Sequence, residues 1–271
     1  MTIACCQWDI IKGEAGANRD TARALIRDAD ADLVILPELA FSGYFFDSTD
    51  QATALSESVP DGESCRMLCT VAAETGSTVV AGIAERDGDR LYNSAVVVTP
   101  RGVLGTYRKT HLYYQETHHF AAGDSGFGVW TLTDRSGTSY RLGVMICFDW
   151  FFPEAARTLA LAGADVIAHP SNLVMPHCPN AMPFRALENG VFTATANRTG
   201  SETNGSESLS FIGQSTICSP AAETLARAAD HGQAIIRAEV DPALARSKRL
   251  NAFNDRWEDR RADLYGERST V

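Results

Sequence analysis

The sequence predicts an α/β fold in which helices cover a mixed β-sheet. Apolar runs of strand length alternate with segments of helical periodicity through the first two thirds of the 271 residues. Hairpin signals separate some neighbouring strands, which adds antiparallel pairs to the sheet. The sequence has no fixed-period repeat and no Pro-, Ser- or Gly-rich linker, so we expect residues 1–271 to form a single domain.

The first part of the chain has clear turn signals. A Pro60-Asp61-Gly62 turn precedes a helix that Gly76 closes, and Asp87-Gly88-Asp89 predicts a hairpin. Helical spacing of apolar residues predicts helices over residues 18–30 and 63–75. Apolar or alternating runs predict strands over residues 2–8, 32–36, 77–85, 90–99 and 103–107.

The same criteria apply to the rest of the chain. Helices are expected over residues 154–164 and 180–189. The polar, Gly-containing stretch 197–208 predicts a loop. Strands are expected over residues 129–133, 142–146, 165–169, 191–196, 211–218, 223–225 and 233–240.

Composition excludes several classes of function. A formal net charge of -10 and a pI near 5.1 argue against a nucleic-acid-binding surface. No apolar run reaches the roughly 20 residues that a membrane span requires, and the opening MTIACCQW lacks the basic segment of a signal peptide. The seven cysteines are scattered without a paired framework, so we expect free thiols in a reducing cytoplasm.

One cysteine occupies a position suited to a nucleophile. In RLGVMICFDWFFPE (residues 141–154), an apolar strand ends at Cys147, and Pro153 and Glu154 mark a helix start shortly afterwards. The turn between strand and helix exposes a side chain, and the positive end of a helix lowers a thiol pKa. A lone cysteine is more simply interpreted as a small buried hydrophobe. The position of Cys147 alone therefore does not decide between a nucleophile and a core residue.

Two further strand ends carry a reactive group. Glu38 follows the run DLVIL-Pro, and Lys109 follows VLGTY-Arg. Ligand sites of layered α/β folds gather at strand ends, so these groups and Cys147 can converge. Taken alone, each charged residue is more simply explained as solvated surface charge.

Three stretches decide between these interpretations. ILPELAFSGY, YRKTHLYYQE and GVMICFDWFFPE resemble, in order, the three signature regions of the nitrilase superfamily, the carbon–nitrogen hydrolases, and the closing DRRADLY is similar to that family's last segment. The stretches RKTHL, CFDWFFPE and HPSNLVMP are most similar to a group described as amidases or nitrilases. The resemblance covers essentially the whole chain and implies a four-layer α-β-β-α sandwich.

The resemblance also implies catalytic roles. It maps a Glu–Lys–Cys triad onto Glu38, Lys109 and Cys147, and a second family glutamate onto Glu116. In this scheme Cys147 attacks the amide carbon, Glu38 moves protons, and Glu116 holds Lys109 beside the developing oxyanion. A carboxyl group shielded from water suits acid–base work near neutral pH, and a backbone N–H can complete the oxyanion site.

Three residues are expected to contact substrate. The backbone N–H of Phe148 is the second oxyanion donor, and Tyr44 lies in a region that the family places near the substrate. Asn172 ends the HPSN stretch and can donate to substrate. Core packing explains Tyr44 equally well, and a turn cap explains Asn172 equally well.

Rival sites have weaker support. His169 ends a strand and could serve as the base for Cys147, but no third group completes that arrangement. Cys65 and Cys69 lie one helical turn apart without a matching pair at zinc spacing, so we expect no metal and no cofactor. A non-catalytic scaffold and acyl transfer to an amine remain as alternatives to hydrolysis.

The expected reaction is hydrolysis of a small amide to a carboxylic acid and ammonia through a cysteine thioester. Many family nitrilases carry Trp-Glu after the cysteine, whereas Phe148-Asp149 is more similar to the amidase and carbamoylase branches. Nitrile hydrolysis and N-carbamoyl amide hydrolysis are the alternatives. The resemblance also implies a homodimer in which the tail, about residues 250–271 with Trp257 and Tyr265, packs on a partner subunit.

Overall fold

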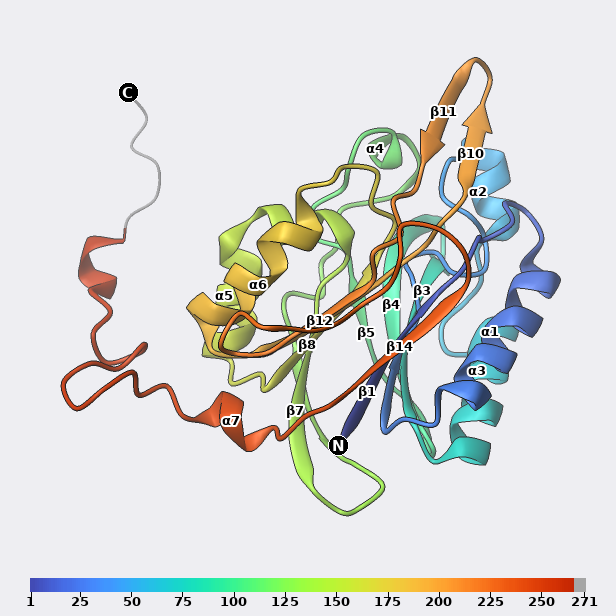
Figure 1. Cartoon of the computed structure of the whole chain (residues 1–271). Helices are drawn as coiled ribbons and strands as arrows, with labels where there is room; N and C mark the ends of the chain where they lie inside the picture. The colour runs from blue at the N-terminus through green and yellow to red at the C-terminus, as the bar shows by residue number, and fades with distance from the viewer. Residues whose placement is uncertain (266–271) are drawn as a thin grey trace, which may run out of the picture.

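The computed structural model describes residues 1–265 of the chain. Within them, two six-stranded sheets pack face to face (Figure 1). The first sheet has the order β14 (Ala234–Glu239), β1 (Thr2–Gln7), β2 (Leu33–Ile35), β3 (Thr78–Asp87), β4 (Arg90–Thr99) and β5 (Gly102–Arg108). The second has the order β13 (Thr224–Arg227), β12 (Thr216–Cys218), β9 (Phe192–Asn197), β8 (Val166–Ser171), β7 (Ser139–Val144) and β6 (Val129–Thr133).

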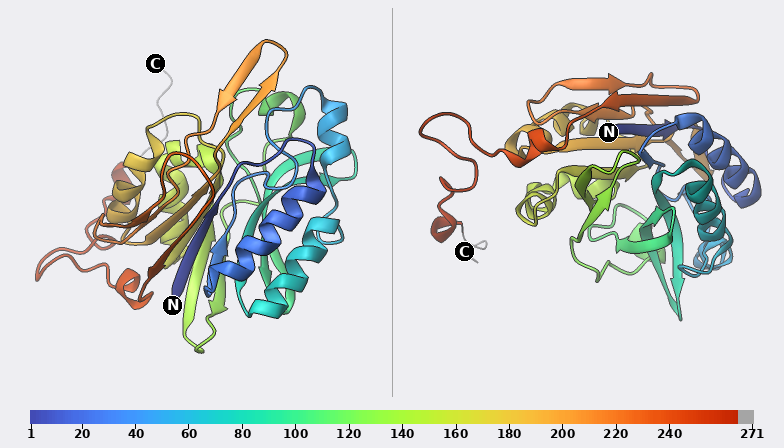
Figure 2. Two further views of the ribbon diagram at one scale, coloured as in Figure 1. Left: turned by 45° about the vertical axis from the view of Figure 1, so that its right-hand side comes forward. Right: turned by 90° about the horizontal axis from the view of Figure 1, so that it is seen from below.

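Helices cover the outer face of each sheet. The two views of Figure 2 show α1 and α3 on the first sheet, and Figure 1 shows α5 and α6 on the second. The predicted α-β-β-α sandwich is therefore confirmed. The helices are α1 (Ala15–Ala29), α2 (Thr49–Leu55), α3 (Glu63–Thr75), α4 (Glu116–His119), α5 (Pro153–Leu161), α6 (Cys178–Asn189) and α7 (Ala243–Arg246), with 3-10 turns η1 (Cys147–Phe151) and η2 (Ala262–Leu264).

Strand β1 shows why an unbroken apolar run forms an inner strand. Successive side chains of a strand point to opposite faces, so Cys5 joins the core between the two sheets and Cys6 the core beneath α1 and α3. Both faces are buried, which accounts for the lack of polar alternation in this run. All seven cysteines are free thiols, as the sequence predicts.

Two predictions in the second half are wrong. The predicted loop 197–208 contains the hairpin β10 (Ser201–Asn204) and β11 (Glu207–Ser210). Its two-residue turn is Gly205-Ser206, a hairpin signal that the polar strands concealed, and Gly205 has φ 59°. The predicted strand 211–218 is paired only from residue 216, because Gly213 and Gln214 both have φ 57° and break the extended backbone.

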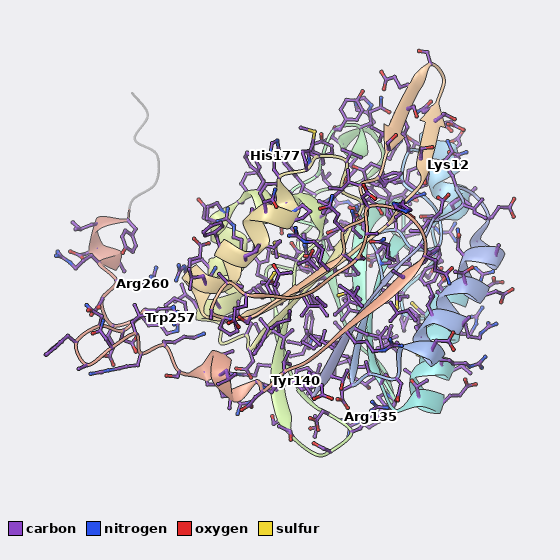
Figure 3. All side chains as sticks on the ribbon, in the orientation of Figure 1. Lys12, Arg135, Tyr140, His177, Trp257 and Arg260 are labelled. Atoms are coloured by element: carbon purple, nitrogen blue, oxygen red, sulfur yellow. The ribbon has the colours of Figure 1, made fainter. Side chains whose placement is uncertain are left out.

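The described part of the tail packs against its own chain. Trp257 is half-buried against the core, and its ring lies 4.9 Å from the Arg157 guanidinium carbon of α5. Figure 3 labels Trp257 and Arg260 on the side of the molecule that carries α5 and α6. Tyr265 is exposed, and residues 266–271 of the predicted tail lie outside the described residues. Among residues 1–265, no helix is both long and apolar enough to cross a membrane.

Candidate active site

Cys147 lies on a sharp turn between β7 and α5. The strand ends at Val144, and Cys147 begins η1 with φ 39°, in the left-handed region that side-chain-bearing residues rarely adopt. Such strain costs on the order of 1–3 kcal/mol and persists only where the surroundings enforce it. Here the carbonyl oxygen of Cys147 lies 2.9 Å from Nε2 of buried His169. The predicted turn between a strand and a helix at Cys147 is therefore confirmed.

Asp149 holds this turn from within. Its fully buried carboxylate accepts the Ile146 N–H at 2.8 Å and the Tyr107 hydroxyl at 2.7 Å through Oδ2. Its Oδ1 accepts the backbone N–H of His111 at 3.1 Å and lies 2.7 Å from the His111 ring nitrogen. Asp149 therefore shapes the turn and ties it to the segment that follows β5.

Glu38 lies just beyond β2 and is completely buried. Its Oε1 accepts hydrogen bonds from Lys109 Nζ at 2.6 Å and from Asn93 Nδ2 at 2.7 Å. Its Oε2 has no hydrogen-bond partner among the described residues. The backbone at Glu38 packs directly on Gly82 of β3, where an added Cβ would lie 2.4 Å from the Glu38 Cα. One carboxylate oxygen is thus fixed and the other is available for proton transfer.

Lys109 follows β5 and carries a buried ammonium between two carboxylates. Its Nζ lies 2.7 Å and 2.9 Å from the two oxygens of Glu116, in addition to the bond with Glu38. Burial by itself lowers the pKa of Lys109, but the charges of Glu116 and Glu38 outweigh it and raise that pKa. Lys109 therefore stays protonated at neutral pH.

Glu116 begins α4 and is held by Tyr44. The Tyr44 hydroxyl donates to Glu116 Oε1 at 2.6 Å, and both side chains are buried. Burial raises the pKa of Glu116 to about 7, against the opposing effect of Lys109. Tyr44 is not among the described residues that line the adjacent pocket, so what the structure shows for it is a contact with Glu116.

The Cys147 thiol belongs to the same electrostatic cluster. Burial and the nearby charge of Glu38 raise its pKa, while Lys109 and a hydrogen bond from the Asn172 backbone N–H act in the opposite direction. The expectation that the helix N-terminus lowers this pKa is therefore wrong, because desolvation outweighs it. The resting group is a thiol, and its proton must leave as the sulfur attacks.

Asn93 of β4 is a site residue that the sequence analysis missed. It is buried, and its Nδ2 lies 2.7 Å from Glu38 Oε1 and 3.3 Å from Glu116 Oε2. It therefore contacts the same two carboxylates that hold Lys109. The available signal was a lone amide in the strand RLYNSAVVVT, which is otherwise largely apolar.

A pocket opens over Cys147, with a cavity of about 200 Å³. Phe148 and Asn172, two of the three predicted substrate-binding residues, line it. As the second residue of η1, Phe148 has an N–H without an intrahelical acceptor. The remaining lining residues are Tyr113, Trp150, Phe151, Leu173, Val174, Met175 and His177.

The alternative bases and ligands are not supported by the geometry. The nearest recorded contact of His169 with Cys147 is to the carbonyl oxygen and not to the sulfur, and burial lowers the pKa of His169 to about 4. Within residues 1–265, no group of three or more His, Cys, Asp or Glu side chains is arranged to hold a metal ion.

A four-layer α-β-β-α sandwich that brings a cysteine, a lysine and two glutamates into one buried cluster, three of them just beyond strand ends, defines a layered α/β hydrolase. Residues 2–250 match the family model described as carbon–nitrogen hydrolase. The chain belongs to this family, the nitrilase superfamily, and is an enzyme that hydrolyses C–N bonds.

Individual relatives agree with this assignment. The chain is 51% identical over 255 residues to a protein of Pyrococcus abyssi named nitrilase, with 93% of this chain and 94% of that one covered. It is 31% identical to the N-carbamoylputrescine amidase of Solanum lycopersicum, over 98% and 93% of the two chains. The crystal structure of an amidase from Nesterenkonia sp. superimposes with a TM-score of 0.79 at 25% identity, over 97% and 94%.

Proposed function

We propose that the chain hydrolyses a small primary amide to a carboxylic acid and ammonia through a thioester on Cys147. The observation that carries this proposal is the Lys109 ammonium, fixed between Glu38 and Glu116 and electrostatically coupled to the Cys147 thiol. Thiol, proton carrier and cation are the three groups that acyl transfer from an amide requires.

The first half-reaction forms the thioester. Glu38 accepts the thiol proton of Cys147 on its free oxygen as the sulfur bonds to the amide carbon, and the carbonyl π electrons move to oxygen. The Lys109 ammonium and the Phe148 N–H stabilise that oxyanion. Glu38 then returns its proton to nitrogen, the C–N bond breaks, and ammonia leaves.

The second half-reaction regenerates the thiol. Glu38 takes a proton from water as the water oxygen bonds to the thioester carbon. The C–S bond breaks, the carboxylic acid leaves, and the proton on Glu38 returns to the Cys147 sulfur. Glu116, held by Tyr44, keeps Lys109 in place through both steps.

Ammonia release from matched amides and nitriles tests this proposal, with Cys147→Ala as the control. We expect Cys147-dependent release from amides, together with an acyl adduct in the mass of protein quenched during turnover. Undiminished activity of Cys147→Ala contradicts the scheme. The second candidate is nitrile hydrolysis, which the 51% identity to the Pyrococcus abyssi nitrilase favours; faster release from nitriles would support it.

We also propose that two copies associate through the face formed by α5 and α6. Leu161, Phe184 and Leu187 are exposed apolar side chains on these helices, and such a face is typical of an interface. The tail from about residue 250, which packs beside α5 of its own chain, would then also lie against the partner subunit. A solution mass of two chains is expected, and a monomer at working concentration contradicts the proposal.

A further inference from the structure

We propose that the preferred substrate is an uncharged primary amide whose acyl group is apolar and no larger than about one ring. This inference rests on the proposed function, because it concerns the pocket above Cys147. The cavity of about 200 Å³ is small, and for comparison an apolar cavity of about 150 Å³ accommodates benzene.

The walls of this pocket are largely aromatic. The rings of Phe148 and Phe151 stack with centroids 5.5 Å apart, and the rings of Tyr113 and Phe148 lie 5.0 Å apart. Val174 and Met175 complete the apolar surface, and Met175 is half exposed at the rim. A hydrocarbon acyl group buried between these side chains loses contact with water, which favours binding by about fourfold per methylene.

Charged acyl groups find no partner there. None of the described residues that line the pocket is Asp, Glu, Lys or Arg, and His177 is exposed at the rim, where Figure 3 labels it near α6. A carboxylate or ammonium on the acyl chain would lose its hydration without gaining an opposite charge. This argument disfavours N-carbamoyl amino acids and N-carbamoyl diamines as substrates.

Asn172 supplies a polar group that matches a carboxamide. It is 3% exposed, lines the pocket with Cys147, and has neither Nδ2 nor Oδ1 hydrogen-bonded to any described residue. A buried amide without partners is costly, and a substrate carboxamide offers the acceptor and donors that would satisfy it. A nitrile offers no N–H donor, so Asn172 favours amides over nitriles.

The test compares acyl groups of equal length and different charge. We expect kcat/KM to rise about fourfold per methylene from acetamide to pentanamide. It should fall at least tenfold from pentanamide to succinamate or 4-aminobutanamide. Met175→Gln should reduce the gain per methylene, whereas Leu225→Gln on β13, an exposed apolar position outside the pocket, should keep it. Equal or faster turnover of the charged amides overturns the inference.

Two further measurements separate this inference from the proposed function. Calorimetric binding to the Cys147→Ala variant reports the acyl preference without turnover. If this variant binds charged amides more tightly than apolar ones, the inferred substrate class is wrong. If it prefers apolar amides but the native chain shows no Cys147-dependent turnover, only the proposed function is wrong. Asn172→Ala should lower the amide-to-nitrile rate ratio at least tenfold, and an unchanged ratio overturns its role.

A different observation, the buried ion pair of Arg198 and Glu202, carries a second inference. Both side chains are almost fully buried, and they hydrogen-bond each other. Glu202 Oε2 also accepts the backbone N–H of Tyr44 at 3.0 Å and of Phe45 at 2.6 Å. Lys12, labelled in Figure 3 below the β10–β11 hairpin, reaches the Phe45 carbonyl at 2.9 Å.

We infer that Glu202 is a positioning residue for the reaction. It fixes the backbone of Tyr44, whose hydroxyl donates to Glu116, and Glu116 in turn holds Lys109. The guanidinium of Arg198 also lies 4.0 Å over the Phe211 ring, against which Tyr44 packs edge-on. The hairpin that carries Glu202 therefore determines where the Tyr44 hydroxyl lies.

A double-mutant cycle tests this role. We expect Glu202→Gln to lower kcat/KM about tenfold in the native chain and less than twofold in a Tyr44→Phe background, because its effect passes through that hydroxyl. Asp165→Asn, which alters another buried ion pair away from the site, should leave kcat/KM within twofold. If Glu202→Gln fails to fold, Lys12→Met replaces it in the cycle, because Lys12 holds the same segment through the Phe45 carbonyl. Its effect on kcat/KM should likewise vanish in the Tyr44→Phe background. Additive losses overturn the inference.

Discussion

Asn93 offers a sharp test of the buried cluster, because it contacts Glu38 and cannot itself take part in proton transfer. Asn93→Ala removes the 2.7 Å bond to Glu38 Oε1 and leaves that oxygen with Lys109 alone. A hydrogen bond to a charged group contributes about 1.5–3 kcal/mol. A loss of about 2 kcal/mol in the transition state corresponds to about a 30-fold decrease in kcat/KM.

Ammonia release under first-order conditions measures kcat/KM, and denaturant unfolding measures stability in parallel. Asn189→Ala is the matched control, since Asn189 is also a buried amide but bonds the Arg185 carbonyl at 2.9 Å, away from the cluster. We expect both variants to lose similar stability and only Asn93→Ala to lose activity. If Asn93→Ala keeps kcat/KM within twofold of the native value, the role assigned to Asn93 in orienting Glu38 is wrong.

Three other outcomes follow from the same geometry. Gly82→Ala should abolish most activity and cost about 1–3 kcal/mol of stability, because its Cβ would displace Glu38; Gly16→Ala, with open space around it, is the control for both assays. Tyr44→Phe should lower kcat/KM about tenfold with a normal unfolding transition, and an unchanged rate would show that Glu116 needs no such support. The pKa of Glu116 is raised to about 7, so the native state favours its protonated form. Relative to Glu116→Gln, stability should therefore fall as pH rises from about 4.5 to about 7, and an opposite slope in urea unfolding would contradict that shift.

The sequence predicted the parts of the fold that depend on local pattern. Apolar runs such as β1 and β8 and the turn at Cys147 were identified because burial on both faces leaves a continuous signal. The β10–β11 hairpin was missed because its strands are polar, and their extended form depends on pairing with each other. Tertiary pairing overrides local preference at such strands.

For the candidate site, too, some residues were predicted from the sequence and others were missed. Glu38, Lys109, Glu116 and Cys147 were named from motif order, and the first three are joined by hydrogen bonds while the thiol lies within their electrostatic field. Asn93 was not named, because a contact between β4 and the end of β2 is visible only in three dimensions. The direction of the Cys147 pKa shift was also mispredicted, since burial is a property of the whole fold rather than of a helix terminus.

The reactive cluster is divided between the two sheets. Glu38 and Lys109 extend from β2 and β5 of one sheet, whereas Cys147 extends from β7 of the other. The shared apolar core between the sheets, together with the hydrogen bonds of Asp149 to Tyr107 and His111, sets the alignment of the sulfur with the carboxylates. The turnover rate therefore depends on how the two sheets are positioned relative to each other. Methyl deletions between the sheets, far from any substrate, should therefore slow turnover as well as lower the melting temperature.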